Sequence, residues 1–165
     1  IVPWKPPCAS DNTSCDFATL TNDACDYYVI HPDSFIDRDN IVCVARATIP
    51  MTKLLYGISE YNIHHVPRSK MVLGIPWHGY TYECDTVVNN VCSLPKDETS
   101  GTCDFSRRVP ISYKDIVHDH EMVSNAIADK NWFDAPNYVT MRGLKRIQVW
   151  YEDKFSLSAK YRLVH

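Results

Sequence analysis

The chain lacks three features that would assign it to whole classes of protein. It has no apolar run that approaches the roughly eighteen residues needed to span a membrane. Its formal net charge of -3 gives no basic patch for nucleic acid or for an anionic membrane surface. None of its cysteines forms a C-x-x-C pair or has a histidine at zinc-finger spacing, so we expect no metal site and no other cofactor. Nucleic acids and membranes are therefore excluded as expected partners.

What is present fits one soluble globular domain. The 165 residues are 45% hydrophobic and 22% charged, which is enough apolar material for one core. The sequence begins at Ile1 and not at Met, so we expect a processed or incomplete chain.

Cysteine usage indicates an oxidising compartment. Because a zinc site is disfavoured, the cysteines are expected to form disulfides in a secreted or lumenal protein. The odd number leaves one thiol unmatched, and the sequence does not fix the pairing. Asn12 begins an N-x-S/T acceptor sequence for glycosylation, in agreement with that compartment. The seven cysteines are Cys8, Cys15, Cys25, Cys43, Cys84, Cys92 and Cys103.

The stretch from Lys70 to Tyr82 is the most informative part of the chain. Met71 to Ile75 is a short apolar run, typical of a strand that is buried on both faces of a parallel sheet. Pro76 cannot donate a hydrogen bond to a sheet, so we expect the strand to end there. The residues that follow would enter a loop at the edge where α/β folds bind ligands, unless their rings simply cap a core. These residues are Trp77, His78, Tyr80 and Tyr82.

The pattern upstream predicts a parallel sheet. An aromatic and β-branched segment at 26–30 is followed by helical spacing of apolar residues at 51–64 and then by the strand at 70–76. This order predicts a β-α-β crossover, whose two strands run parallel. Two parallel strands cannot close a sheet, and an apolar edge would promote aggregation, so we expect further polypeptide to complete the fold.

The remainder predicts a cysteine-bearing insertion at about 83–146, followed by the end of a strand and a helix. Ser112 and Asp115 have capping-box spacing and predict a helix over 112–128, while residues 146–151 alternate as in a half-buried strand. Asp153 is expected to cap a last amphipathic helix. The expected apolar residues of that helix are Phe155, Leu157, Tyr161 and Leu163.

The motifs resemble those of a known enzyme family. The pieces that carry the resemblance are G-I-P-W-x-G-Y from Gly74 to Tyr80, Q-V-W-Y from Gln148 to Tyr151, and D-A-C-D-Y-Y-V from Asp23 to Val29. In their order along the chain they resemble the carboxyl-terminal half of chitobiase-like members of glycoside hydrolase family 18. The resemblance implies an α/β fold, a partial (β/α)8 TIM barrel with the end of strand five, strands six and seven, and the insertion. Strands one to four, the missing amino-terminal half, would come from the same or another chain.

The same resemblance implies glycoside hydrolysis, but this chain lacks residues on which that reaction depends in the family. Family 18 hydrolysis is substrate-assisted, so it departs from the scheme of two catalytic carboxylates. Its general acid lies in an acidic strand-four motif, D-x-x-D-x-D-x-E, which does not occur in this chain. The Tyr that usually ends strand six is replaced by Pro32, and a Tyr after strand seven by His78. We therefore assign no catalytic residue and expect this chain to be inactive by itself.

Four residues are candidates for binding the substrate that the family implies, an oligosaccharide of N-acetylglucosamine. Trp77 and Trp150 would stack on sugar rings or fill the mouth of the barrel. Asp33 would bind a sugar hydroxyl or stabilise a turn, and His78 would contribute to binding or be structural. Two functions remain open: a glycosidase-related protein that is secreted or lysosomal, and a non-catalytic, chitinase-like binding or structural protein.

Overall fold

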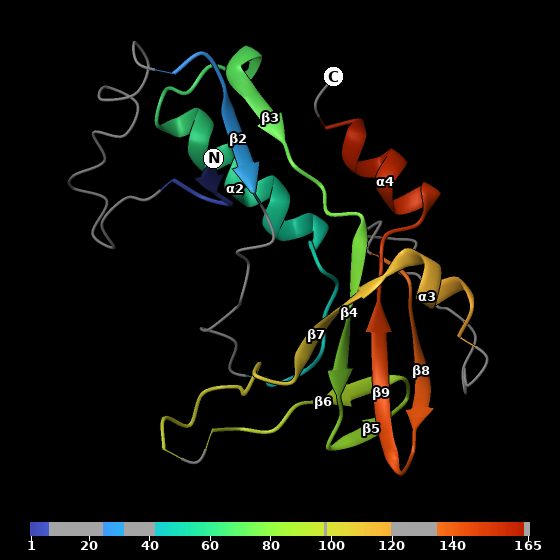
Figure 1. Ribbon diagram of the computed structural model, residues 1–165. Helices are drawn as coiled ribbons and strands as arrows, with labels where there is room; N and C mark the ends of the chain where they lie inside the picture. Colours follow the sequence, from blue (N-terminus) through green and yellow to red (C-terminus); the bar gives the residue numbers. More distant parts are fainter. Residues whose placement is uncertain (7–24, 32–41, 98, 120–134, 164–165) are drawn as a thin grey trace.

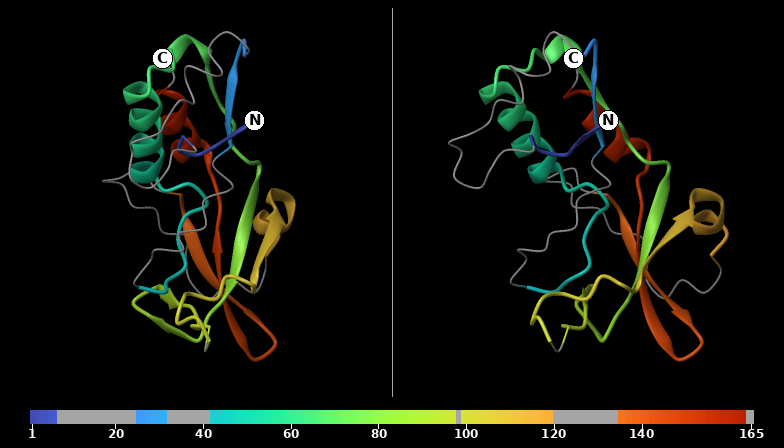
Figure 2. Two further views of the ribbon diagram at one scale, coloured as in Figure 1. Left: turned by 90° about the vertical axis from the view of Figure 1, so that its left-hand side faces the viewer. Right: turned by 60° about the vertical axis from the view of Figure 1, so that its left-hand side comes forward.

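The computed structural model describes residues 1–6, 25–31, 42–97, 99–119 and 135–163. Two sheets dominate the structure, and the chain passes from the first to the second between β3 and β4 (Figure 1). The molecule is elongated, with a parallel sheet and its helix at one end and an antiparallel sheet at the other (Figure 2). No helix in the described part of the chain has both the length and the apolar character to cross a membrane.

The parallel sheet contains the predicted β-α-β unit. Its strands are β1 (Val2–Pro3), β2 (Tyr28–His31) and β3 (Met71–Leu73), in that order, and both pairings are parallel. Helix α2 (Met51–Ile63) lies between β2 and β3 in the sequence, and the 3-10 turn η2 (Arg68–Lys70) precedes β3. The prediction from sequence period and strand order is confirmed for this unit.

Helix α2 packs on one face of the parallel sheet through its buried residues. Tyr61 is fully buried against Tyr28 and Ile30, and its hydroxyl donates a hydrogen bond to the carbonyl of Pro3 at 2.7 Å. Leu54 joins a second cluster in which residues of β3 and α4 also take part. The helix therefore holds all three parallel strands to one another.

The prediction that the β3 segment is buried on both faces is wrong. Strand β3 is half-exposed, and the side chain of Val72 is 41% exposed. It lies at the edge of the sheet, and among the described residues no strand pairs with its outer edge. Met71 and Leu73 pack towards α2 on one face of the sheet. Val72 is exposed because no described residues cover the opposite face of this apolar strand.

The second sheet is antiparallel. Its strands are β4 (His78–Glu83), β7 (Arg108–Ser112), β8 (Asn137–Arg142) and β9 (Lys145–Trp150), in the order β7-β4-β9-β8. A separate hairpin is formed by β5 (Thr86–Val88) and β6 (Val91–Ser93). The expected loop after Pro76 is thus wrong for His78, Tyr80 and Tyr82, because β4 finds antiparallel partners in β7 and β9.

Among the described residues, two disulfides lie near the β5–β6 hairpin. Cys43 pairs with Cys103 and Cys84 with Cys92, and both bonds lie in a core cluster with Tyr80 and Tyr82. Cys25 forms no disulfide with another described cysteine, and Cys8, Cys15 and the glycosylation candidate Asn12 lie outside the described residues.

Two short helices complete the described chain. Helix α3 (Tyr113–Val117) begins with the predicted cap, in which the Ser112 hydroxyl accepts a hydrogen bond from the backbone N–H of Asp115. The helix predicted to reach 128 is described only to Val117, because 120–134 lie outside the described residues. Helix α4 (Lys154–Tyr161) begins at the predicted cap Asp153. Of the apolar residues predicted to be buried, Leu157 and Leu163 are partly buried and Leu163 packs on a core cluster, whereas the prediction is wrong for Phe155 and Tyr161. Phe155 is 70% exposed, and the buried residues of the helix are Ser156 and Lys160.

Candidate functional site

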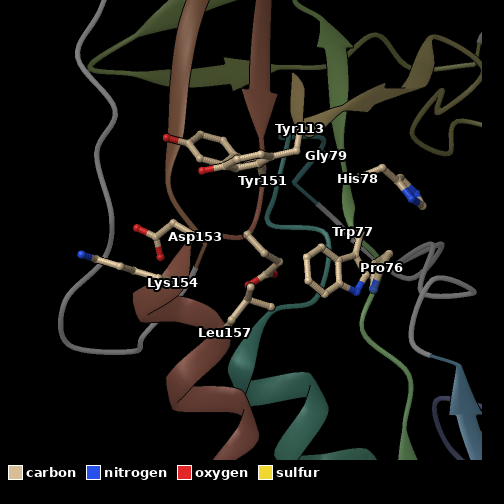
Figure 3. A pocket seen from close by; sticks show the side chains of 10 residues that line it. Pro76, Trp77, His78, Gly79, Tyr113, Tyr151, Asp153, Lys154 and Leu157 are labelled. Carbon is tan, nitrogen blue, oxygen red and sulfur yellow. The ribbon is translucent and has the colours of Figure 1, made fainter. Parts of the chain in front are cut away.

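A cavity of about 240 Å³ lies where the two halves of the fold meet. One wall is the segment that joins β3 to β4, and the other is the segment that joins β9 to α4 (Figure 3). Its lining residues are Pro76, Trp77, His78, Gly79, Tyr113, Tyr151, Glu152, Asp153, Lys154 and Leu157.

Local sequence explains why these two segments approach each other. A Cβ on Gly79 would lie 2.5 Å from the carbonyl oxygen of Trp150 and 3.0 Å from the Cβ of Tyr151, so only glycine permits this contact. Asp153 accepts hydrogen bonds from the backbone N–H groups of Phe155 and Ser156, and the Ser156 hydroxyl receives one from the Asp153 N–H. This capping box turns the chain sharply at the edge of the cavity.

Aromatic rings form much of the cavity wall. Trp77 is 84% exposed, an unusually open position for so large an apolar side chain. Tyr151 contacts Tyr113 with ring centroids 6.3 Å apart and Tyr138 with centroids 6.1 Å apart. Burial, with the charge of Asp153 as a lesser cause, raises the pKa of the Tyr151 hydroxyl. The phenol is therefore kept neutral and can act as a hydrogen-bond donor.

A buried ion pair lies beside the cavity. The ammonium of Lys160, on α4, pairs with Oε1 of Glu152, and the two side chains are 0% and 4% exposed. The other carboxylate oxygen, Oε2 of Glu152, is buried and has no hydrogen-bond partner in the part of the chain that the structure describes. A buried acceptor without a partner costs about 1–3 kcal/mol. Oε2 of Glu152 thus lies beneath the surface of the cavity, where a molecule in the cavity does not reach it.

The face of the antiparallel sheet that carries His78 and Trp150 is a different surface. Tyr80 is paired with Trp150 across β4 and β9, so their side chains share a face, and His78 lies two residues before Tyr80. The His78 and Tyr80 rings form an edge contact with centroids 5.0 Å apart, and the guanidinium of Arg108 lies 3.3 Å from the Tyr80 ring centroid. In Figure 3 the His78 imidazole points away from the rings of Tyr113 and Tyr151.

Trp150 is held in place by a network of buried amides. Its indole N–H donates to Oε1 of Gln148 at 3.0 Å, and Nε2 of Gln148 donates to Oδ1 of Asn137 at 3.0 Å. Nε2 of Gln148 also donates to the carbonyl of Asn90, in the turn of the β5–β6 hairpin. The network fixes one orientation of the indole and joins the hairpin to the sheet.

The structure brings together only some of the predicted site residues. Trp77 and His78 line one cavity, whereas Trp150 is not part of its wall and packs instead with Tyr80 and Tyr82. Asp33 and Pro32 lie outside the described residues. Glu152 was missed by sequence reasoning, although a Glu-Asp pair directly after an apolar strand was the signal that could have found it.

The described residues hold no group of three or more His, Cys, Asp or Glu side chains arranged as metal ligands. The polar side chains that line the cavity are those of His78, Tyr113, Tyr151, Glu152, Asp153 and Lys154.

Comparison with known proteins gives relatives over nearly the whole chain. Di-N-acetylchitobiase of Rattus norvegicus is 29% identical over 171 residues, covering 99% of this chain and 45% of the relative. Di-N-acetylchitobiase of Homo sapiens is 29% identical over 168 residues, covering 96% of this chain and 42% of the relative. This chain is homologous to the di-N-acetylchitobiases. It spans less than half the length of these relatives, and no protein-family model matches it.

Solved structures agree with this relationship at the level of fold. A GH18 chitinase from Cycas revoluta in complex with (GlcNAc)4 superposes with a TM-score of 0.66 at 13% identity, over 99% of this chain and 46% of that chain. A chitinase from Chromobacterium violaceum superposes with a TM-score of 0.66 at 18% identity, over 99% of this chain and 45% of that chain. The chain therefore has the fold of about half of a family 18 chitinase.

Proposed function

We propose that this chain is the carboxyl-terminal part of a chitobiase-like glycoside hydrolase family 18 protein that binds oligosaccharides of N-acetylglucosamine. The observation that carries the proposal is the similarity to di-N-acetylchitobiases over 96–99% of the chain. The parallel strands around α2 and the cavity at the carboxyl end of β3 support it, because α/β barrels keep their ligand sites at that end of their strands.

In this proposal the described parallel strands form one arc of a (β/α)8 barrel, with β2 and β3 as strands six and seven. Residues at about 83–146 are the insertion after strand seven. The exposed side chain of Val72 and the edge of β3, which pairs with no strand among the described residues, support completion of the barrel by the amino-terminal half, on the same or another chain.

The proposed sugar contacts are Asp33, Trp77, His78 and Trp150. Trp150 is suited to this role because its indole is only partly buried and the amide network fixes its orientation. His78 lies on the same face of the sheet, beside Tyr80.

The chain by itself is expected to be inactive, since it lacks the acidic strand-four motif. The test is turnover of a fluorogenic chitobiose substrate by the full-length protein and by residues 1–165 alone. Hydrolysis by the full-length protein and none by the fragment supports the proposal. A full-length protein that neither hydrolyses nor binds the sugar contradicts it.

A non-catalytic binding protein is the second candidate. Pro32 stands where the resemblance expects a Tyr hydroxyl, and losing one such hydrogen bond typically lowers a rate by about two to three powers of ten. This candidate predicts binding of N-acetylglucosamine oligosaccharides by the full-length protein without turnover. Replacing Pro32 by Tyr would then raise the rate only if the acidic motif is present elsewhere.

We also propose a secreted or lysosomal location for this protein. The disulfides Cys43–Cys103 and Cys84–Cys92 support an oxidising compartment, and the acceptor sequence at Asn12 agrees with it. A loss of mass after enzymatic removal of N-glycans, abolished by Asn12→Gln, would support this assignment. A native protein without glycan at Asn12 would contradict the glycosylation.

A further inference from the structure

The direction of each hydrogen bond in the amide network follows from the indole of Trp150. An indole N–H can only donate, so Oε1 of Gln148 must be the atom that faces it at 3.0 Å. The amide nitrogen of Gln148 then points the other way, and it donates to Oδ1 of Asn137 and to the carbonyl of Asn90. Gln148 is only 1% exposed, so turning its amide over would leave buried polar groups unpaired. The network therefore has a single arrangement.

The other end of the network is the tip of the β5–β6 hairpin. Nδ2 of Asn90 donates to Oδ1 of Asn137 at 2.7 Å, and the carbonyl of Asn90 lies 2.6 Å from Nε2 of Gln148. Asn89 and Asn90 form the two-residue turn of the hairpin, with φ of 49° and 64°. Asparagine tolerates this left-handed conformation, which such turns require. The turn thus holds Asn90 against the sheet, whereas Asn89 is exposed.

The hairpin is anchored at a second place, away from its tip. Cys92, in β6, is fully buried in its disulfide with Cys84, and its carbonyl accepts a hydrogen bond from the N–H of Ala45 at 2.9 Å. An antiparallel bridge also joins Ser93 to Val44. A two-stranded hairpin is only marginally stable by itself, so these contacts are what keep its tip in a fixed position.

The network leaves Trp150 able to contact a ligand in one way. Cross-strand pairing places Trp150 beside Tyr80 and Gln148 beside Tyr82 on the same face of the sheet. Tyr82 is buried, whereas Trp150 is only partly buried. Because Gln148 engages the indole N–H, Trp150 can offer a ligand its aromatic ring but not a hydrogen bond. The orientation of that ring therefore decides how well it stacks.

We propose that Asn90 is a positioning residue for ligand binding at Trp150, which it affects without touching the ligand. Through Asn137 and Gln148 it holds the indole in one orientation, so the β5–β6 hairpin contributes to the affinity of this surface. The ligand class, an oligosaccharide of N-acetylglucosamine, rests on the proposed function. The coupling of Asn90 to Trp150 rests on the hydrogen bonds alone.

The test compares two adjacent residues of the same turn in the full-length protein. Asn90→Gly keeps the left-handed conformation and the backbone carbonyl, and removes the side-chain bond to Asn137. Isothermal titration with a thio-linked, non-hydrolysable trimer of N-acetylglucosamine should show binding weakened about fivefold. Asn90→Asp should weaken it more, because a carboxylate would then face Oδ1 of Asn137. Asn89→Gly is the matched control and should leave the affinity unchanged.

A double-mutant cycle separates positioning from a general loss of stability. Trp150→Phe keeps an aromatic ring but removes the N–H on which the network acts. In that background Asn90→Gly should have no further effect on affinity, because no indole remains to be oriented. The same fivefold loss in both backgrounds would overturn the proposal, as would unchanged affinity in Asn90→Gly.

Hydrogen exchange of the Trp150 indole tests the coupling without a ligand. In protein with ¹⁵N-labelled tryptophan, Asn90→Gly should speed exchange of this N–H about fivefold, and Asn89→Gly should not. Unchanged exchange in Asn90→Gly would overturn the positioning role even if Trp150→Phe failed to fold.

The two measurements distinguish this inference from the proposed function. If the full-length protein does not bind the trimer but exchange responds as expected, the proposed sugar class fails and the coupling of Asn90 to Trp150 stands. If it binds the trimer and neither affinity nor exchange responds to Asn90→Gly, the proposed function stands and the positioning role fails.

Discussion

Lys160 and Glu152 form an ion pair inside the protein, with the side chains only 0% and 4% exposed. Glu152 follows β9 directly and Lys160 lies two turns along α4, so the pair fixes the helix against the strand that precedes it. Transfer of two charges out of water is costly, and only their mutual attraction offsets that cost. The pair therefore fixes the position of α4 relative to the cavity wall, whatever its net contribution to the free energy of folding.

The first prediction concerns the loss of one partner of this pair. Lys160→Met should destabilise the protein by about 3–5 kcal/mol, because it leaves the carboxylate of Glu152 buried and unpaired. The measurement is the free energy of unfolding in urea. Lys154→Met, at an exposed position one residue into the same helix, is the control and should change stability by less than about 0.5 kcal/mol. Equal small effects of both variants would show that Glu152 is not charged and buried as described.

The second prediction compares the two disulfides. Cys43–Cys103 joins residues 60 apart, and Cys84–Cys92 joins residues 8 apart. Chain entropy then predicts losses of roughly 4 and 2.5 kcal/mol when each bond is removed by paired Cys→Ala replacement. Thermal unfolding of both double variants checks the order, and a larger loss for the short loop would contradict the entropic account.

The elements that the sequence predicted well depend on local signals. The capping residues Ser112 and Asp153 start the helices where they were expected, because a cap needs only neighbours three residues away. The strand–helix–strand unit around α2 was also predictable, since periodicity and strand order require parallel pairing.

The failures have a common physical origin in partners that are distant in sequence. The antiparallel strand β4 was expected to be a loop because its partners β7 and β9 come about 30 and 70 residues later along the chain. The face of α4 was only partly predicted, because lysine is normally a surface residue and only pairing with Glu152 makes the burial of Lys160 possible. Likewise, no pattern in the sequence shows that Trp77 lines the cavity while Trp150 packs with Tyr80 and Tyr82.

The third prediction concerns alkaline pH. Burial, together with a hydrogen bond donated to Oδ2 of Asp119 at 3.0 Å, raises the pKa of the Tyr138 hydroxyl. Because the folded pKa lies above the unfolded value of about 10, this stabilisation is complete below about pH 10 and is lost as the pH rises further. The free energy of unfolding should therefore begin to fall as the pH rises above about 10.

Tyr138→Phe tests that assignment. It should cost about 1 kcal/mol near neutral pH, where the hydrogen bond is intact, and it should make stability less sensitive to alkali. Tyr161→Phe, at a half-exposed position of α4, is the matched control. Denaturation at several pH values checks both, and an identical alkaline slope for wild type and Tyr138→Phe would assign the effect to other groups.

The last prediction reverses the usual effect of a helix substitution. In the middle of an exposed helix Gly→Ala stabilises by about 1 kcal/mol, because alanine loses less backbone entropy. Gly57 lies in the middle of α2, but a Cβ there would lie 2.2 Å from the carbonyl oxygen of Trp4 and 3.1 Å from its ring. Gly57→Ala should therefore destabilise by about 1–3 kcal/mol as Trp4 is displaced. Thr52→Ala, at an exposed position of the same helix, is the control and should be neutral or stabilising. If Gly57→Ala also stabilised the protein, the contact between α2 and the segment after β1 would be wrong.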